Sequence, residues 1–125
     1  MAHETCFDRI DEALENRASD FETYMNSSDA YEEGCENAGI GPFYEYGLCF
    51  DVVTSSDDDH EELPVEYCRF VMSTGGPGDE IRFFPSGRIE YWFLDWFDGA
   101  CRDVTSEDWA QWLWDTFDDL GMLPF

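Results

Sequence analysis

The chain has 125 residues, of which 43% are hydrophobic and 18% aromatic, so it is too apolar for a disordered acidic tail and predicts one folded acidic domain over residues 1–125. Thirty acidic residues against six arginines and no lysine give a net charge of −24 at pH 7. This charge excludes nucleic acid as a direct partner and favours a basic protein that holds nucleic acid.

Cysteine usage and hydropathy indicate the compartment. Five cysteines, an odd number without a C-x-x-C pair, argue against a secreted disulfide framework and predict small, buried, reduced side chains. No apolar run approaches the ~18 residues of a membrane span, and the segment MAHETCFDRIDE does not resemble a signal peptide. We therefore expect a cytoplasmic protein that does not enter a membrane.

The first predicted element is an amphipathic helix over residues 5–26. Its apolar positions recur every three or four residues, as one helix face requires: Phe7, Ile10, Leu14, Ala18, Phe21 and Met25. Ser19 and Asp20 leave open a second segment that starts after a bend near Ala18. A short helix over residues 29–38 follows, with Asp29 and Glu32 as a capping pair.

After the GIGP break the apolar period changes to two, which predicts strands. We expect strands over residues 44–52, 65–73, 80–84 and 88–97, joined as an antiparallel meander. In the first, Tyr44, Tyr46, Leu48, Phe50 and Val52 would share one face. The strand over 88–97 has aromatic side chains on both faces. One face would pack on helices, and the opposite face would be either covered by another element or a partly exposed binding patch.

The last predicted element is a helix that follows a T-x-x-D capping pair, Thr105 and Asp108, and ends at Gly121. Its apolar stripe consists of Trp109, Trp112, Leu113, Thr116, Phe117 and Leu120. The expected fold class is therefore α+β, with N-terminal helices, a four-stranded mostly antiparallel sheet and a C-terminal amphipathic helix packed on the sheet.

The short motifs argue against catalysis and bound cofactors. The run DDDHEE at residues 57–62 lacks the spacing of a calcium loop and is interpreted as a solvated or partner-contact loop. The run STGGPGDE at 73–80 lacks the lysine of a phosphate-binding loop, so it predicts a hairpin turn. No nucleophile stands in a catalytic context, and we expect no enzyme activity, no metal and no cofactor.

Acidic ridges are the candidate partner-binding residues. Carboxylates three or four residues apart on a helix lie ~5–6 Å from one another, close to the ~7 Å between successive phosphates of one DNA strand. The predicted contact residues lie on the first helix, in the 57–62 loop and on the last helix: Asp8, Asp11, Glu12, Glu15, Glu22, Asp57, Asp58, Asp59, Glu61, Glu62, Asp115, Asp118 and Asp119.

The chain resembles a class of small acidic proteins from phages and mobile elements. The resemblance lies in its size, its charge, these helix ridges and the runs DDDHEE and EDWAQWLWDTFDDLG. The class comprises the DNA-mimicking anti-CRISPR and antirestriction proteins. Within it the chain looks most similar to the type I anti-CRISPRs that block the DNA site of the surveillance complex, including those that act on type I-C.

The resemblance implies a monomeric inhibitor in the host cytoplasm. It would block target DNA and PAM binding by a type I CRISPR surveillance complex. An acidic inhibitor or adaptor of a restriction enzyme, nuclease or toxin remains an alternative, as does halophilic adaptation of a globular protein.

Overall fold

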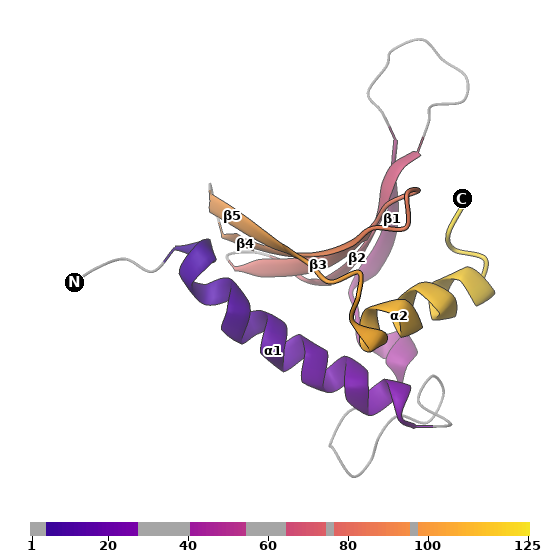
Figure 1. Cartoon of the computed structure of the whole chain (residues 1–125), viewed down its shortest axis with the longest axis horizontal. Helices are drawn as coiled ribbons and strands as arrows, with labels where there is room; N and C mark the ends of the chain where they lie inside the picture. The colour runs from indigo at the N-terminus through magenta and orange to yellow at the C-terminus, as the bar shows by residue number, and fades with distance from the viewer. Residues whose placement is uncertain (1–4, 28–40, 55–64, 75–76, 96–97) are drawn as a thin grey trace.

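The described part of the computed structural model, residues 5–27, 41–54, 65–74, 77–95 and 98–125, contains a five-stranded sheet with two α-helices on one of its faces (Figure 1). The strands lie in chain order and each pairs antiparallel with the next. The α+β class and the meander are confirmed. The strands are β1 (Cys49–Thr54), β2 (Val65–Ser73), β3 (Gly78–Phe83), β4 (Ile89–Asp95) and β5 (Asp98–Asp103).

The expectation of four strands is wrong, because the segment predicted as one strand over 88–97 belongs to a hairpin. β4 ends at Asp95, which pairs directly with Asp98 at the start of β5. The sequence DWFD at this connection contains no Asn-Gly or Asp-Gly turn signal. The DGACRD sequence of β5 is also poor in β-branched and aromatic residues. The fifth strand was therefore marked neither by a turn dipeptide before it nor by strand propensity within it.

The strand predicted over 44–52 is also displaced. Its first residues form a short 3-10 helix, η2 (Phe43–Glu45), in which the amide of Tyr46 donates to the carbonyl of Phe43 at 2.9 Å. Phe43 is buried in the core, which holds this turn in place. At Gly47 a Cβ atom would lie 2.1 Å from Cε1 of Phe70, so the chain passes this ring where only glycine fits.

Helix α1 (Cys6–Met25) is continuous, so the alternative of a bend near Ala18 is wrong. Thr5 and Asp8 form a capping box at its start. Phe7 was expected on the buried face but is 68% exposed, and its ring packs under the guanidinium of Arg102 at 4.9 Å. The short helix expected over 29–38 lies outside the described residues.

Helix α2 (Asp108–Asp119) packs on the sheet as predicted, through ring contacts of Phe117 with Phe50, Phe70 and Phe83. Its end is also confirmed, because Gly121 adopts the left-handed conformation with φ +74°. The predicted Thr105 cap is wrong.

Glu107 occupies the N-cap of α2 without a side-chain hydrogen bond. The Thr105 hydroxyl instead binds Asp103 and the backbone of Ile89, so it ties the end of β5 to β4.

One hydrophobic cluster joins the helices and the sheet among the described residues. The two helices meet where Phe21 of α1 stacks on Trp109 of α2 with ring centroids 5.4 Å apart. Of the cysteines, Cys6 and Cys68 are buried as expected, and burial raises the pKa of both thiols. Cys49 is exposed and Cys101 half-buried, so the expectation of burial is wrong for Cys49, while Cys35 lies outside the described residues.

Candidate partner-binding surface

The predicted acids of α1 lie on its solvent face. Asp8, Asp11, Glu12, Glu15 and Glu22 are all exposed, while the buried positions of the helix face the sheet. The helix is uninterrupted from Cys6 to Met25, which keeps the i, i+3 and i, i+4 spacing of the carboxylates fixed. The structure therefore places these five acids together on one element.

Two of these five acids have structural roles as well. The Asp8 carboxylate accepts hydrogen bonds from the backbone and side chain of Thr5, and these bonds lower the pKa of Asp8. Asp11 forms an ion pair with Arg102 of β5 at 3.1 Å. Among the described residues, Glu12, Glu15 and Glu22 have no ion-pair partner, which leaves their charge available to another molecule.

The predicted acids of α2 are exposed too. Asp115, Asp118 and Asp119 lie on the solvent face, and the last turn contains no basic residue. Carboxylates at the C-terminal end of a helix meet the negative end of its dipole, which is unfavourable for stability. Both helices cover the same face of the sheet (Figure 1), so their outward acids belong to one layer of the molecule.

The acids predicted in the 57–62 loop, Asp57, Asp58, Asp59, Glu61 and Glu62, lie outside the described residues.

The arginines are all engaged by carboxylates. Arg9 pairs with Asp95 at 2.7 Å, and Arg17 pairs with Asp79 at 2.7 Å, so both basic residues of α1 are directed to the sheet. The other four arginines lie on the strands or directly before one, and each forms an ion pair with an acid of the sheet or of α1: Arg69, Arg82, Arg88 and Arg102. All six arginines of the sequence thus have a carboxylate partner within the chain.

The face of the sheet opposite the helices carries a nearly balanced charge network. Arg69 and Arg82 stand directly opposite each other on β2 and β3, a repulsive arrangement. Glu80, only 3% exposed, separates them, at 2.7 Å from Arg82 and 3.7 Å from Arg69. The Arg82 guanidinium also lies 3.9 Å from the ring centre of Trp92. The charges of this face are therefore satisfied internally.

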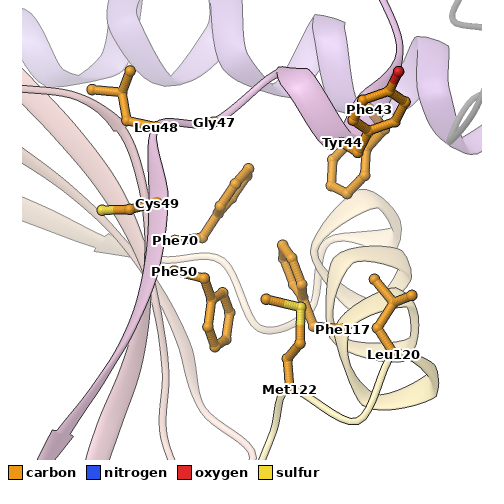
Figure 2. Close-up of a pocket in the computed structure, with 10 residues that line it drawn as sticks. All are labelled: Phe43, Tyr44, Gly47, Leu48, Cys49, Phe50, Phe70, Phe117, Leu120 and Met122. Carbon is orange, nitrogen blue, oxygen red and sulfur yellow. The ribbon is translucent and has the colours of Figure 1, made fainter.

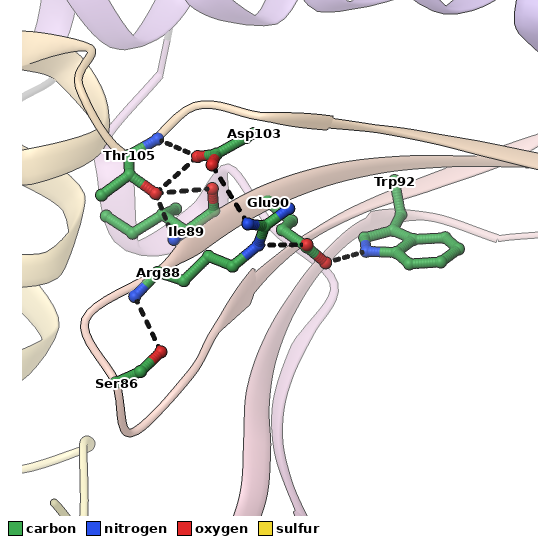
Figure 3. A network of polar contacts seen from close by, with 7 residues as sticks. All are labelled: Ser86, Arg88, Ile89, Glu90, Trp92, Asp103 and Thr105. Atoms are coloured by element: carbon green, nitrogen blue, oxygen red, sulfur yellow. Dashed lines mark hydrogen bonds and ion pairs between the residues drawn. The ribbon is translucent and has the colours of Figure 1, made fainter.

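Figure 3 shows how the network continues at the edge of the sheet. Glu90 accepts a hydrogen bond from Nε1 of Trp92 at 3.0 Å and pairs with Arg88, which also contacts Asp103 at 3.3 Å. The acids that interrupt the aromatic run RIEYWFLDWFDG thus have internal partners. Asp95 binds Arg9, and Asp98 accepts from the backbone amide of Cys6 at 2.7 Å, at the positive end of α1.

A second polar cluster is buried between α1 and the sheet. Asp79, 5% exposed, accepts from Arg17 at 2.7 and 3.0 Å and from the Tyr91 hydroxyl at 2.8 Å. Ser73 donates to the same carboxylate at 2.5 Å. Arg17 also donates to the Tyr46 hydroxyl at 2.9 Å, and that hydroxyl donates to Asp20 at 2.6 Å. No buried side-chain nitrogen or oxygen among the described residues lacks a partner.

This cluster changes the acidity of its members. Burial raises the pKa of Tyr91, reinforced by the Asp79 charge, and burial with the Asp20 hydrogen bond raises the pKa of Tyr46. Burial alone would lower the pKa of Arg17, but its bonds to Asp79 and Tyr46 outweigh burial and raise it. The arginine remains charged and the tyrosines remain neutral, so the cluster acts as a fixed tie between helix and sheet.

The cluster predicts a steep loss of stability at high pH. An unfolded tyrosine loses its proton near pH 10, whereas folded Tyr46 and Tyr91 keep theirs. Above pH 10 the unfolded state binds fewer protons, so the free energy of unfolding should fall by about 1.4 kcal/mol per pH unit for each tyrosine. Urea unfolding between pH 9 and 11.5 measures the slope. The thiols of Cys6 and Cys68, whose pKa values are also raised, add to the slope in every variant. Tyr91→Phe should therefore make the slope shallower by about 1.4 kcal/mol per pH unit, and an unchanged slope would contradict the assignment.

A groove with a volume of about 190 Å³ opens between η2, β1 and α2 (Figure 2). We call it the β1–α2 groove. Three residues that line it are among the exposed large hydrophobic side chains, with Leu48 62%, Tyr44 57% and Leu120 45% exposed. The groove is lined by Phe43, Tyr44, Gly47, Leu48, Cys49, Phe50, Phe70, Phe117, Leu120 and Met122.

The sequence reasoning missed this groove, because it assigned Tyr44 and Leu48 to one apolar face of a strand and Leu120 to the apolar stripe of the last helix. The available signals were Gly47, which interrupts the strand pattern, and Gly121, which ends α2 directly after Leu120. Gly121 adopts the left-handed conformation and Gly47 passes close to the Phe70 ring, while the neighbouring Leu120 and Leu48 are exposed.

Neither described helix is long and apolar enough to cross a membrane. Within the described ranges, no three His, Cys, Asp or Glu side chains are grouped so as to hold a metal ion. No protein-family model, no curated protein and no solved structure matches the chain.

Proposed function

We propose that this chain is a non-enzymatic inhibitor that mimics the charge of DNA and occupies the DNA-binding channel of a host defence complex, specifically a type I CRISPR surveillance complex. The asymmetry of its charge carries the proposal. The outward faces of α1 and α2 present acids of which Asp11 alone among the predicted contact residues of these helices has a basic partner, Arg102, whereas every arginine is paired with a carboxylate of the chain itself.

This arrangement suits a channel lined with arginine and lysine. Each unpaired helix carboxylate can replace a DNA phosphate, and the paired arginines add little repulsion at the point of contact. The helices are held by the aromatic core and by the buried Arg17–Asp79 pair, so the carboxylates are positioned before binding. Inhibition then requires only occupancy of the channel by a monomer in the host cytoplasm.

Competition with DNA at different salt concentrations tests the proposal. A purified type I-C surveillance complex is bound to labelled target duplex, and the chain is titrated against it at 50 and 200 mM NaCl. We expect displacement of the duplex and an affinity of the chain that falls at least about tenfold at the higher salt, because charge pairs dominate. Absence of displacement, or an affinity that does not depend on salt, would refute the proposal.

Circular dichroism in the same two buffers is the control for halophilic adaptation. A DNA mimic should remain folded at 50 mM NaCl, whereas a halophilic protein should unfold there because its acids repel one another. The same titration against a type I restriction enzyme tests the antirestriction alternative, since it differs only in the identity of the basic partner.

A further inference from the structure

We infer that the β1–α2 groove is a docking site for an apolar side chain carried on a basic segment of the partner protein. The inference rests on the proposed function, because that function supplies a basic partner. It assigns a contact that charge mimicry does not provide, since phosphate has no apolar group.

The groove has the form of an anchor pocket. Its floor is aromatic, with Phe70 and Phe117 5.0 Å apart between ring centroids and Phe50 4.8 Å from Phe117. Leu48 and Leu120 stand at its two sides, on the segment leading into β1 and at the end of α2 (Figure 2). An apolar side chain that enters would be removed from water against the aromatic floor, and interface anchors bind in desolvated pockets of this kind.

Charge around the groove selects the occupant. Asp118 and Asp119 directly precede Leu120, Glu45 directly follows Tyr44, and none of these acids has an ion-pair partner among the described residues. The groove lining contains no basic residue. An apolar side chain flanked by arginine or lysine therefore matches both the floor and the rim.

A second copy of the chain is a poor occupant. Two molecules of net charge −24 would bring the acidic ends of α2 together, and their repulsion opposes association. A neutral apolar segment would fill the groove but would gain nothing from the rim. The basic segment is the occupant that uses all the features of the groove.

Two peptides test the inference without the surveillance complex. Acetyl-RRLLRR-amide and acetyl-RRSSRR-amide have equal charge and differ only in the central apolar pair. In calorimetric titrations at 150 mM NaCl we expect the leucine peptide to bind about tenfold more tightly than the serine peptide, because its side chains enter the groove. Equal affinities, or no binding of either peptide, would overturn the inference.

Matched variants locate the difference. In L48S/L120S, which changes exposed side chains only, the preference for leucine should fall below about twofold. Val52→Ser, an exposed residue outside the groove lining, should keep the preference. D118N/D119N should weaken both peptides by similar factors. A preference for leucine that survives in L48S/L120S would place the contact elsewhere and overturn the inference.

The outcomes separate this inference from the proposed function. If the wild-type chain does not displace target DNA, charge mimicry fails whatever the peptides show. If it displaces DNA but binds the two peptides equally, mimicry stands and the anchor fails. A wild-type dimer in light scattering that L48S/L120S dissociates would identify a second copy as the occupant, and it would also overturn the inference.

Discussion

Asp79→Asn is expected to lower the free energy of unfolding by on the order of 3 kcal/mol, a large fraction of the ~5–15 kcal/mol that holds a domain of this size. The Asp79 carboxylate accepts from Arg17, Tyr91 and Ser73 in a site that is 5% exposed. The amide that replaces it has no charge to balance Arg17, and its NH₂ group would face donors. The guanidinium is then left half-buried without a counter-ion.

Urea denaturation followed by circular dichroism measures this loss, with Asp115→Asn as the matched control. Asp115 undergoes the same chemical change on an exposed face of α2 without a described ion-pair partner, so its effect should stay within about 0.5 kcal/mol. If both variants have the same stability, the buried cluster does not tie α1 to the sheet.

The Asp79 cluster shows where sequence reasoning reaches its limit. The sequence identified Arg17 on the first helix and a strand that includes Glu80, but not that Arg17 would meet the neighbouring Asp79 across 62 positions of the chain. With thirty acids available, no pattern selects the one that a given arginine will bind. Such pairs depend on the packing of helix against sheet, which local periodicity does not encode.

Local patterns predicted the elements that have strong local signals. Helix α1 has an apolar stripe and a capping box, α2 ends at a left-handed glycine, and β2 begins and ends at the predicted residues. The errors occurred where tertiary contacts override local preference. Burial of Phe43 creates η2 inside an alternating pattern, and pairing with β4 creates β5 from a segment with weak strand propensity.

The candidate partner-binding surface was also predicted only in part, because some of its features follow from local patterns and others depend on tertiary contacts. Exposure of the α1 and α2 acids follows from amphipathic periodicity, which the sequence displays. The nearly balanced charge of the described residues on the opposite sheet face does not, because it depends on cross-strand neighbours such as Arg69 and Arg82 with Glu80 between them. The charge asymmetry that supports the proposed function therefore became visible only in three dimensions.

Charge reversal on the helices should have the largest effect on binding. The pairs E12K/E15K on α1 and D115K/D118K on α2 each reverse two exposed acids three residues apart, and each raises the net charge by four units. We expect each pair to weaken binding to the type I-C complex by at least about 100-fold at 50 mM NaCl, since attraction becomes repulsion inside the channel. All four positions are exposed, so the variants should remain folded.

A control with the same change in net charge separates a localised ridge from overall charge. E66K/T74K/S86K also adds four positive units, at exposed positions on or next to β2 and in the turn before β4. Long-range steering depends on total charge and should weaken equally in all three variants, whereas short-range contacts are lost only where carboxylates meet the channel. If the control loses as much affinity as the helix pairs, the helices do not form the docking face. A loss confined to the helix pairs would assign the contact to the outward layer of α1 and α2.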